Sequence, residues 1–144
     1  MENRALNYLA LMRKANAVQI GETDSGAAVR AQKAKLLILA QDASDNAQRR
    51  AEGFVYGKNV RLVRVPFTKE EISDKVGKSG CSMAALCDAG FAEAFANALA
   101  QQAPAEYAEL AAEMKRLHEN QLARERESRA HERNKKTGKR RNNA

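Results

Sequence analysis

The segment Gly21-Glu22-Thr23-Asp24-Ser25 lies at the start of a predicted helix. It consists of a glycine followed by acidic and hydroxyl side chains. Glycine lets another molecule approach the backbone closely. The free N–H groups of a helix start attract phosphate oxygens or base-edge acceptors, and a carboxylate can accept hydrogen bonds from the N–H groups of guanine. The segment is therefore a candidate RNA contact, and its plain alternative is an ordinary helix cap.

A second candidate for RNA binding is the C-terminal tail, where six basic residues occupy the nine positions from Arg133 to Arg141. Residues 115–144 carry 11 basic and 4 acidic side chains, so their net charge of +7 equals that of the whole chain. Such a tail binds polyanions by releasing counterions, without sequence preference. Few aromatic residues accompany it, which argues against base stacking by the tail. The plain alternative is a solubilising extension. The predicted phosphate contacts are Lys135, Lys136, Lys139, Arg140 and Arg141.

Enzymatic chemistry finds little support in the sequence. Both histidines, His118 and His131, lie in the charged C-terminal extension, where we expect no pocket. Cys81 and Cys87 are predicted to be small apolar residues of one strand, about 20 Å apart and too far for a disulfide. The loop Gly77–Gly80 superficially resembles a phosphate cradle, but it follows a helix and precedes a strand, the reverse of a P-loop. We therefore predict a non-enzymatic protein with no cofactor and no metal.

Length and composition indicate one soluble globular domain with an appended tail. The 144 residues are 44% hydrophobic and 30% charged. No apolar run approaches the roughly 18 residues that a membrane helix needs, and no secretory segment follows the first residues. The expectation is a monomeric cytoplasmic protein that does not bind membranes.

Hydrophobic periodicity predicts alternating helices and strands in residues 1–102. The expected helices cover about 3–14, 23–32, 44–55, 68–76 and 88–102, and the expected strands cover about 17–20, 35–40, 60–65 and 82–87. The strand at 60–65 is predicted to lie at a sheet edge. This order predicts an α/β fold, a three-layer α/β/α sandwich around a small four-stranded mixed sheet.

A C-terminal helical basic extension is expected after the sandwich. Pro104 starts a helix whose first half, with Tyr107, Leu110 and Met114 on one face, is predicted to pack on the domain. Acidic-then-basic pairs four residues apart support a partly solvated helix to residue 132. Residues 133–144 hold no apolar residue that could fold them alone, so they are expected to be disordered unless bound.

The stretch Ala-Lys-Leu-Leu-Ile-Leu-Ala-Gln-Asp-Ala-Ser at residues 34–44 resembles the kink-turn RNA-binding superfamily of ribosomal proteins. Members include the archaeal protein L seven Ae, the eukaryotic protein L thirty e and short bacterial ribosomal-protein-like homologues. Further similarity is found at Gly57-Lys58-Asn59-Val60 and from Lys69 to Gly77, and the resemblance spans roughly residues 4–100. It implies an α/β/α sandwich and an RNA ligand.

The resemblance implies RNA-binding residues at the start of the second helix. The family motif there is Gly-x-Asn-Glu-x-x-Lys. Gly21 matches, whereas Thr23, Asp24 and Ala27 replace asparagine, glutamate and lysine. Thr23 offers one hydroxyl in place of an amide, Asp24 is one methylene shorter, and Ala27 carries no charge. Specific recognition of a kink-turn is therefore expected to be weaker than in the family.

Other contacts implied by the family remain in the sequence. A lysine matches at Lys58, and the loop that follows the fourth helix supplies Lys78, Ser79 and Gly80. Arg30 lies three positions beyond the missing lysine and is a candidate substitute. With Glu22, these residues complete the predicted RNA-binding set.

The sequence and the resemblance together predict a non-enzymatic RNA-binding protein of ribosomal type, whose partners are structured RNA and the ribosome. The globular domain would read a kink-turn-like RNA, and the basic tail would bind neighbouring phosphates. Two alternatives stay open. One is a protein-interaction adaptor that kept the fold and lost specific RNA recognition. The other is a substrate-binding module of the kind found in some RNA methyltransferases, acting with a separate catalytic chain.

Overall fold

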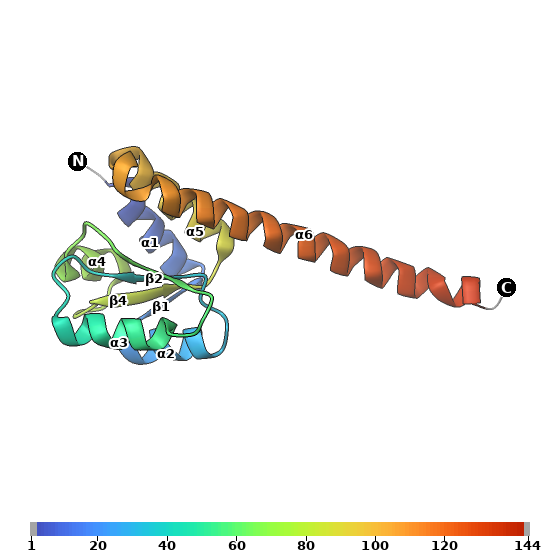
Figure 1. The fold of residues 1–144 in the computed structure, drawn as a ribbon, viewed down its shortest axis with the longest axis horizontal. Helices are drawn as coiled ribbons and strands as arrows, with labels where there is room; N and C mark the ends of the chain where they lie inside the picture. The colour runs from blue at the N-terminus through green and yellow to red at the C-terminus, as the bar shows by residue number, and fades with distance from the viewer. Residues whose placement is uncertain (1–2, 143–144) are drawn as a thin grey trace.

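Four strands and six helices make up the described part of the chain (Figure 1). The computed structural model describes residues 3–142, with side chains described up to residue 135. The elements are α1 (Arg4–Lys14), β1 (Val18–Ile20), α2 (Glu22–Arg30), β2 (Leu36–Leu39), α3 (Asp45–Val55), β3 (Arg61–Arg64), α4 (Lys69–Val76), β4 (Met83–Leu86), α5 (Ala89–Gln102) and α6 (Pro104–Asn142).

The four strands form one mixed sheet in the order β1-β4-β2-β3. β2 pairs parallel with β3 and antiparallel with β4, which also pairs antiparallel with β1. All residues of β2 and β4 are buried, as expected for central strands covered on both faces. β3 lies at the edge, as its alternating apolar and basic residues predicted. The predicted mixed sheet is confirmed.

Helices cover both faces of the sheet (Figure 1). Because side chains alternate along a strand, Leu37 and Leu39 pack under α2 and α3, while Leu36 and Ile38 face the core formed with α1, α4 and α5. Met83 and Ala85 of β4 join the first of these clusters. The structure therefore confirms the predicted three-layer sandwich.

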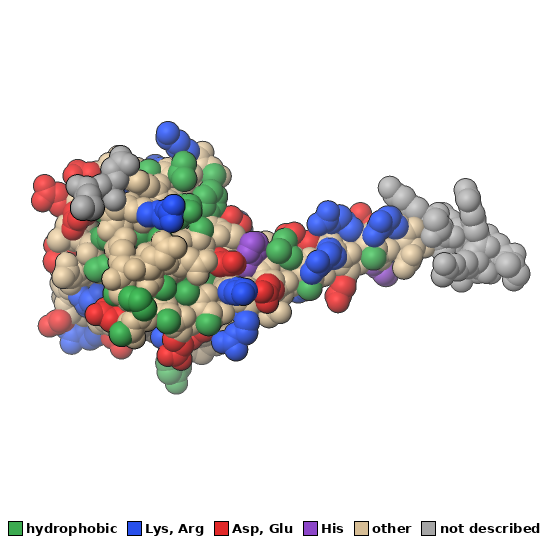
Figure 2. Space-filling model, turned by 90° about the horizontal axis from the view of Figure 1, so that it is seen from above, with side chains coloured by type: hydrophobic (Ala, Val, Ile, Leu, Met, Phe, Trp, Pro, Cys, Tyr) green, Lys and Arg blue, Asp and Glu red, His purple; other side chains and the backbone are tan. Residues whose placement is uncertain are grey.

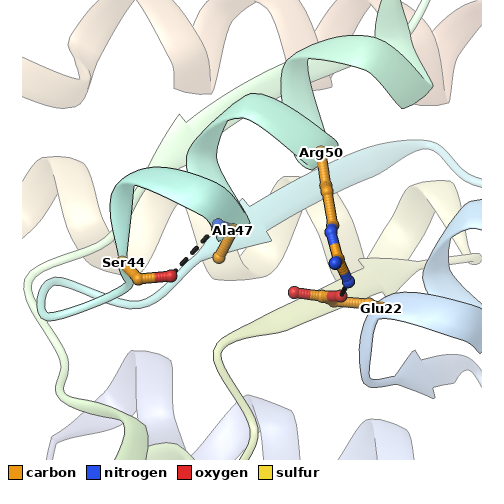
Figure 3. A network of polar contacts seen from close by, with 4 residues as sticks. All are labelled: Glu22, Ser44, Ala47 and Arg50. Carbon is orange, nitrogen blue, oxygen red and sulfur yellow. Dashed lines mark hydrogen bonds and ion pairs between the residues drawn. The ribbon is translucent and has the colours of Figure 1, made fainter.

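Side-chain caps fix the starts of three helices where the sequence placed them. Ser44 accepts a hydrogen bond from the N–H of Ala47 at 3.1 Å (Figure 3), and Asp88 caps α5 in the same way. Thr68 and Glu71 form a reciprocal capping box at α4. Each interaction satisfies a backbone N–H that has no partner within its helix.

The first half of α6 packs on the sandwich, as predicted. Tyr107, Leu110 and Met114 are buried in the larger core cluster. Two polar contacts hold the same region: Arg61 on β3 donates to Glu113 at 2.6 Å, and Nδ1 of His118 lies 3.1 Å from Glu93 on α5. The rest of α6 projects away from the body (Figure 1).

The structure differs from the expected disorder after Arg133, because α6 continues as a helix to Asn142. No glycine or proline interrupts the chain between Pro104 and Gly138, and most residues there are good helix formers. A packed first half also removes the cost of nucleating the second half. The division into a domain, a helix and a separate tail stays a prediction, and residues 143–144 lie outside the described residues.

Both cysteines flank β4 and carry free thiols. Cys81 is buried two residues before the strand, and Cys87 is half-buried directly after it. Burial raises the pKa of the Cys87 thiol, partly offset by Lys35 and Lys33. A raised pKa disfavours the reactive thiolate, which agrees with the predicted packing role of this residue.

Tyr107 links the stability of the α6 junction to pH. Its hydroxyl donates to the backbone oxygen of Arg64 at 3.5 Å, and burial together with the Glu106 carboxylate raises the pKa of Tyr107. A raised pKa contributes stability below the unfolded-state value of about 10, and this contribution is lost as the pH rises through the folded-state pKa. We expect urea unfolding to show that Tyr107→Phe loses less stability than the wild type between about pH 8 and pH 11. Equal losses in the two proteins would contradict this linkage.

Candidate nucleic-acid interface

α2 begins at Glu22, and Gly21 is its N-cap. This corrects the expected helix, which was predicted to cover about residues 23–32. Gly21 has a φ of +94°, a conformation that only glycine adopts readily, and no side chain caps the helix. The chain therefore turns into the helix earlier than the capping residues suggested. Thr23 and Asp24 lie exposed in the first turn, and the first N–H groups of α2 lack a side-chain partner.

The motif positions of α2 share one exposed face. Thr23, Asp24, Ala27 and Arg30 are exposed, whereas the opposite face of α2 packs on the sheet and α3. Ala27 follows Thr23 by four residues and Arg30 follows Ala27 by three, so these side chains lie in a row along the helix. Arg30 thus lies on the same face as the motif positions, in the last turn of α2 rather than in its first.

Glu22 forms an ion pair with Arg50 of α3 (Figure 3). α2 and α3 approach closely beside it, because a Cβ atom on Gly26 would lie 2.7 Å from the ring of Phe54. The Glu22 carboxylate is paired with Arg50, so Asp24 supplies the exposed carboxylate of this segment. Local sequence patterns do not predict this ion pair, since the two residues are 28 positions apart in the chain.

The loop between α4 and β4 lies against the start of α2. Lys78 Nζ donates to the backbone oxygen of Ile20 at 3.4 Å, and a Cβ atom on Gly21 would lie 4.0 Å from it. The N–H of Gly21 donates to Met83 O at 2.9 Å. The structure therefore brings Lys78, Ser79 and Gly80 close to Gly21 and Glu22. Together with Thr23 and Asp24, the exposed residues of the first turn, these residues form what we call the α2-start surface.

An open groove of about 500 Å³ borders the α2-start surface. Ser79, Gly80 and Glu22 line one part of it, and the starts of α3 and α4 line the rest. Its charged side chains are mixed: Glu22, Glu70 and Asp74 face one lysine, Lys69. The globular body therefore offers hydrogen-bonding groups here but no strongly positive field.

Lys58 lies away from the α2-start surface. It sits in the loop between α3 and β3 and lines a hollow with Val29 and Gln32, at the C-terminal end of α2, and with Leu117 of α6. Nine helical residues separate the two ends of α2, a length of about 13 Å. The resemblance grouped Lys58 with the contacts at the start of α2, but the fold places it in different surroundings.

The predicted tail residues are only partly described. Lys135 is exposed on α6, whereas the side chains of Lys136, Lys139, Arg140 and Arg141 lie outside the described ones. Within the described residues, no cluster of histidine, cysteine or acidic side chains is suited to hold a metal ion. A search of the same residues for a helix long and apolar enough to cross a membrane finds none.

Comparisons with known proteins agree with the resemblance and the fold. Solved structures with a similar fold include a protein of unknown function from Bacillus halodurans C (22% identity, TM-score 0.62, covering 68% of this chain and 98% of that chain) and the Giardia lamblia 15.5kD RNA binding protein (20% identity, TM-score 0.53, covering 67% of this chain and 82% of that chain). No curated protein matches significantly. A family model matches residues 3–96, the whole sandwich up to the middle of α5. The chain belongs to the Ribosomal protein L7Ae/L30e/S12e/Gadd45 family.

Proposed function

We propose that this chain is a non-enzymatic RNA-binding protein of ribosomal type that contacts structured, kink-turn-like RNA through the α2-start surface. The observation that carries the proposal is the contact between the α4–β4 loop and the uncapped start of α2, where Lys78 reaches the backbone beside Gly21. Membership of a ribosomal protein family and a fold shared with an RNA-binding protein support it.

The chemistry of the α2-start surface suits an RNA with exposed base edges. Because no side chain caps α2, its first N–H groups are available to phosphate oxygens or base acceptors. The Asp24 carboxylate can accept from guanine N–H groups, and the Lys78 ammonium lies next to the same turn. Backbone donors, one acceptor and one cation together allow recognition of a bent RNA without a large positive surface.

The projecting part of α6 adds affinity that does not depend on RNA sequence. Arg126, Arg129 and Arg133 are exposed and follow one another at intervals of three and four residues, so they lie on one side of the helix. We call residues 125–142 of α6 the arm. Figure 2 shows basic and acidic side chains along its described part, and the basic excess of the arm comes from the five lysines and arginines between Lys135 and Arg141. We infer that the arm binds phosphates that neighbour the kink-turn, on the ribosome or on another structured RNA.

The test is an electrophoretic shift with the whole chain, comparing a kink-turn duplex with a straight duplex of equal length at low and high salt. Preference for the kink-turn that persists at high salt is the expected result, because base-edge contacts depend less on salt than phosphate contacts do. Equal binding of both duplexes that collapses with salt would leave only the arm as an RNA contact and would refute recognition by the α2-start surface.

A protein-interaction adaptor is the second candidate function. It is favoured by the changes at three of the four motif positions, Thr23, Asp24 and Ala27, which remove an amide and a charge from the exposed face of α2. The same experiment separates the candidates, since an adaptor that lost RNA recognition would shift neither duplex.

A further inference from the structure

A basic hollow lies where α6 leaves the sandwich, next to the loop between α3 and β3. We propose that it binds a single-stranded RNA segment, with Tyr56 stacking on a base and the surrounding cations contacting phosphates. We call this region the α6 shoulder and define it by Lys35, Tyr56, Lys58, Arg116 and Arg124. The proposal does not require the α2-start surface to bind RNA.

Two adjoining hollows form the α6 shoulder. One has a volume of about 500 Å³ and is lined by Lys35, Lys58 and Arg116 among others. The second, of about 450 Å³, shares Lys35 and Lys58 and extends along α6 to Arg124. Arg116 and Arg124 lie two turns apart on α6, about 12 Å along its axis. This separation is close to two successive phosphate-to-phosphate spacings, about 6 Å each, in a single strand.

The charge of the α6 shoulder is strongly positive. Among the described residues, Glu113 is the one acidic side chain that lines either hollow, and Arg61 pairs with it at 2.6 Å. The other cations that line the hollows have no acidic partner among the described lining residues; they are Lys35, Lys58, Arg116 and Arg124. This arrangement favours a polyanion, in contrast to the mixed charges of the groove beside α2.

An exposed aromatic residue, Tyr56, directly precedes Gly57 and Lys58, which line the second hollow. Tyr56, the C-cap of α3, has 87% of its surface exposed, far more than the other exposed large apolar residues, Leu11 and Leu122. Gly57 follows with a φ of +69° and turns the chain directly into Lys58. The ring makes little packing contribution to the fold, and base-on-aromatic stacking is a common way for proteins to hold unpaired nucleotides.

The ligand is a single strand rather than a duplex because stacking on Tyr56 needs an unpaired base. Asn59 and Asn120 line the first of the two hollows, and each amide offers both a donor and an acceptor to a base edge. Aromatic, amide and cationic groups together match the base and the backbone of one strand. The resemblance grouped Lys58 with the kink-turn contacts, but its surroundings assign it to this separate region.

The first experiment measures fluorescence anisotropy of labelled decauridine with the whole chain. Tyr56→Ala is expected to weaken binding roughly tenfold with little change in salt dependence, and Tyr56→Phe is expected to bind as the wild type does. Lys58→Ala combined with Arg116→Ala is expected to lower the slope of log K against log salt by about 1.4, the value for two single-strand phosphate contacts. The matched control is Arg4→Ala with Arg49→Ala, which removes two exposed cations elsewhere.

The same binding assay contains the results that overturn the proposal. Decauridine binding that is unchanged in Tyr56→Ala would show that the α6 shoulder is not a binding site for single strands. An equal loss of decauridine affinity in the Lys58→Ala/Arg116→Ala variant and in the Arg4→Ala/Arg49→Ala control would show the same. Absence of decauridine binding by the wild type would do the same and would favour an acidic protein segment as the ligand. Circular dichroism checks that each variant is folded.

A kink-turn duplex without single-stranded ends separates this proposal from the proposed function. Tyr56→Ala is expected to bind that duplex as the wild type does. If the wild type ignores the kink-turn but binds decauridine through Tyr56, the α2-start proposal fails and the α6 shoulder stands. If Tyr56→Ala weakens binding of the kink-turn duplex and of decauridine equally, the α6 shoulder is not a separate site and the present inference fails.

Discussion

Removal of residues 125–144 is expected to abolish most of the salt-dependent part of RNA binding. The deleted segment carries 8 basic and 3 acidic residues, a net charge of +5, and the remaining chain is left almost neutral. Each duplex phosphate contact contributes about 0.9 to the slope of log K against log salt, so losing five contacts lowers the slope by about 4.5. Filter binding of one duplex RNA over a series of salt concentrations measures this slope directly.

The cut after Arg124 keeps the packed part of the helix. Leu117 packs on the core, and His118 contacts Glu93 on α5, so an earlier cut would disturb the fold as well as the charge. The control is a chain of full length with Arg126→Gln, Arg129→Gln and Arg133→Gln, which keeps the helix and removes three exposed cations. A slope that stays the same in the truncated chain would rule out the arm as the source of nonspecific affinity.

Restoring the missing motif lysine by Ala27→Lys is expected to strengthen kink-turn binding by about 1–3 kcal/mol, or roughly 5- to 150-fold. Ala27 is exposed on the same face as Thr23, so a lysine there can reach an RNA held at the start of α2 without disturbing the core. Exposed lysine is also well tolerated within a helix. Competition binding between kink-turn and straight duplexes reports the gain in affinity and in preference.

Ala31→Lys is the matched control for this substitution. Ala31 is also exposed, but it is the C-cap of α2, at the far end from the motif. Both variants add the same charge, so a general electrostatic effect would strengthen binding equally in the two. An equal gain, or no gain with Ala27→Lys, would mean that the exposed face of α2 does not lie against RNA.

Local patterns predicted the elements of this fold well. The apolar run of β2 indicated a buried central strand, and Ser44, Thr68 and Asp88 marked helix starts that the structure confirms. These signals depend on residues close in sequence, where hydrogen bonds between a side chain and a nearby N–H are decisive. The start of α2 was misplaced because a positive φ at Gly21 replaces a side-chain cap, and residue type alone does not report φ.

The candidate sites depended on contacts that local patterns do not contain. The ion pair of Glu22 with Arg50 and the position of Lys58 beside α6 follow from how helices pack across the sheet. Tyr56 was missed because a single aromatic residue in a polar loop has no periodicity. The resemblance named the α4–β4 loop and the start of α2 as RNA contacts, and the structure shows that these two segments lie side by side.

The length of α6 has a consequence for how the protein meets its ligand in solution. Residues 125–142 continue for about 27 Å beyond the body, more than two Debye lengths at physiological salt. A neutral body joined to a distant positive end has a large electric dipole moment. The field of a polyanion would therefore rotate the molecule during diffusion, so that the helix tip arrives first and the folded body searches the nearby surface afterwards.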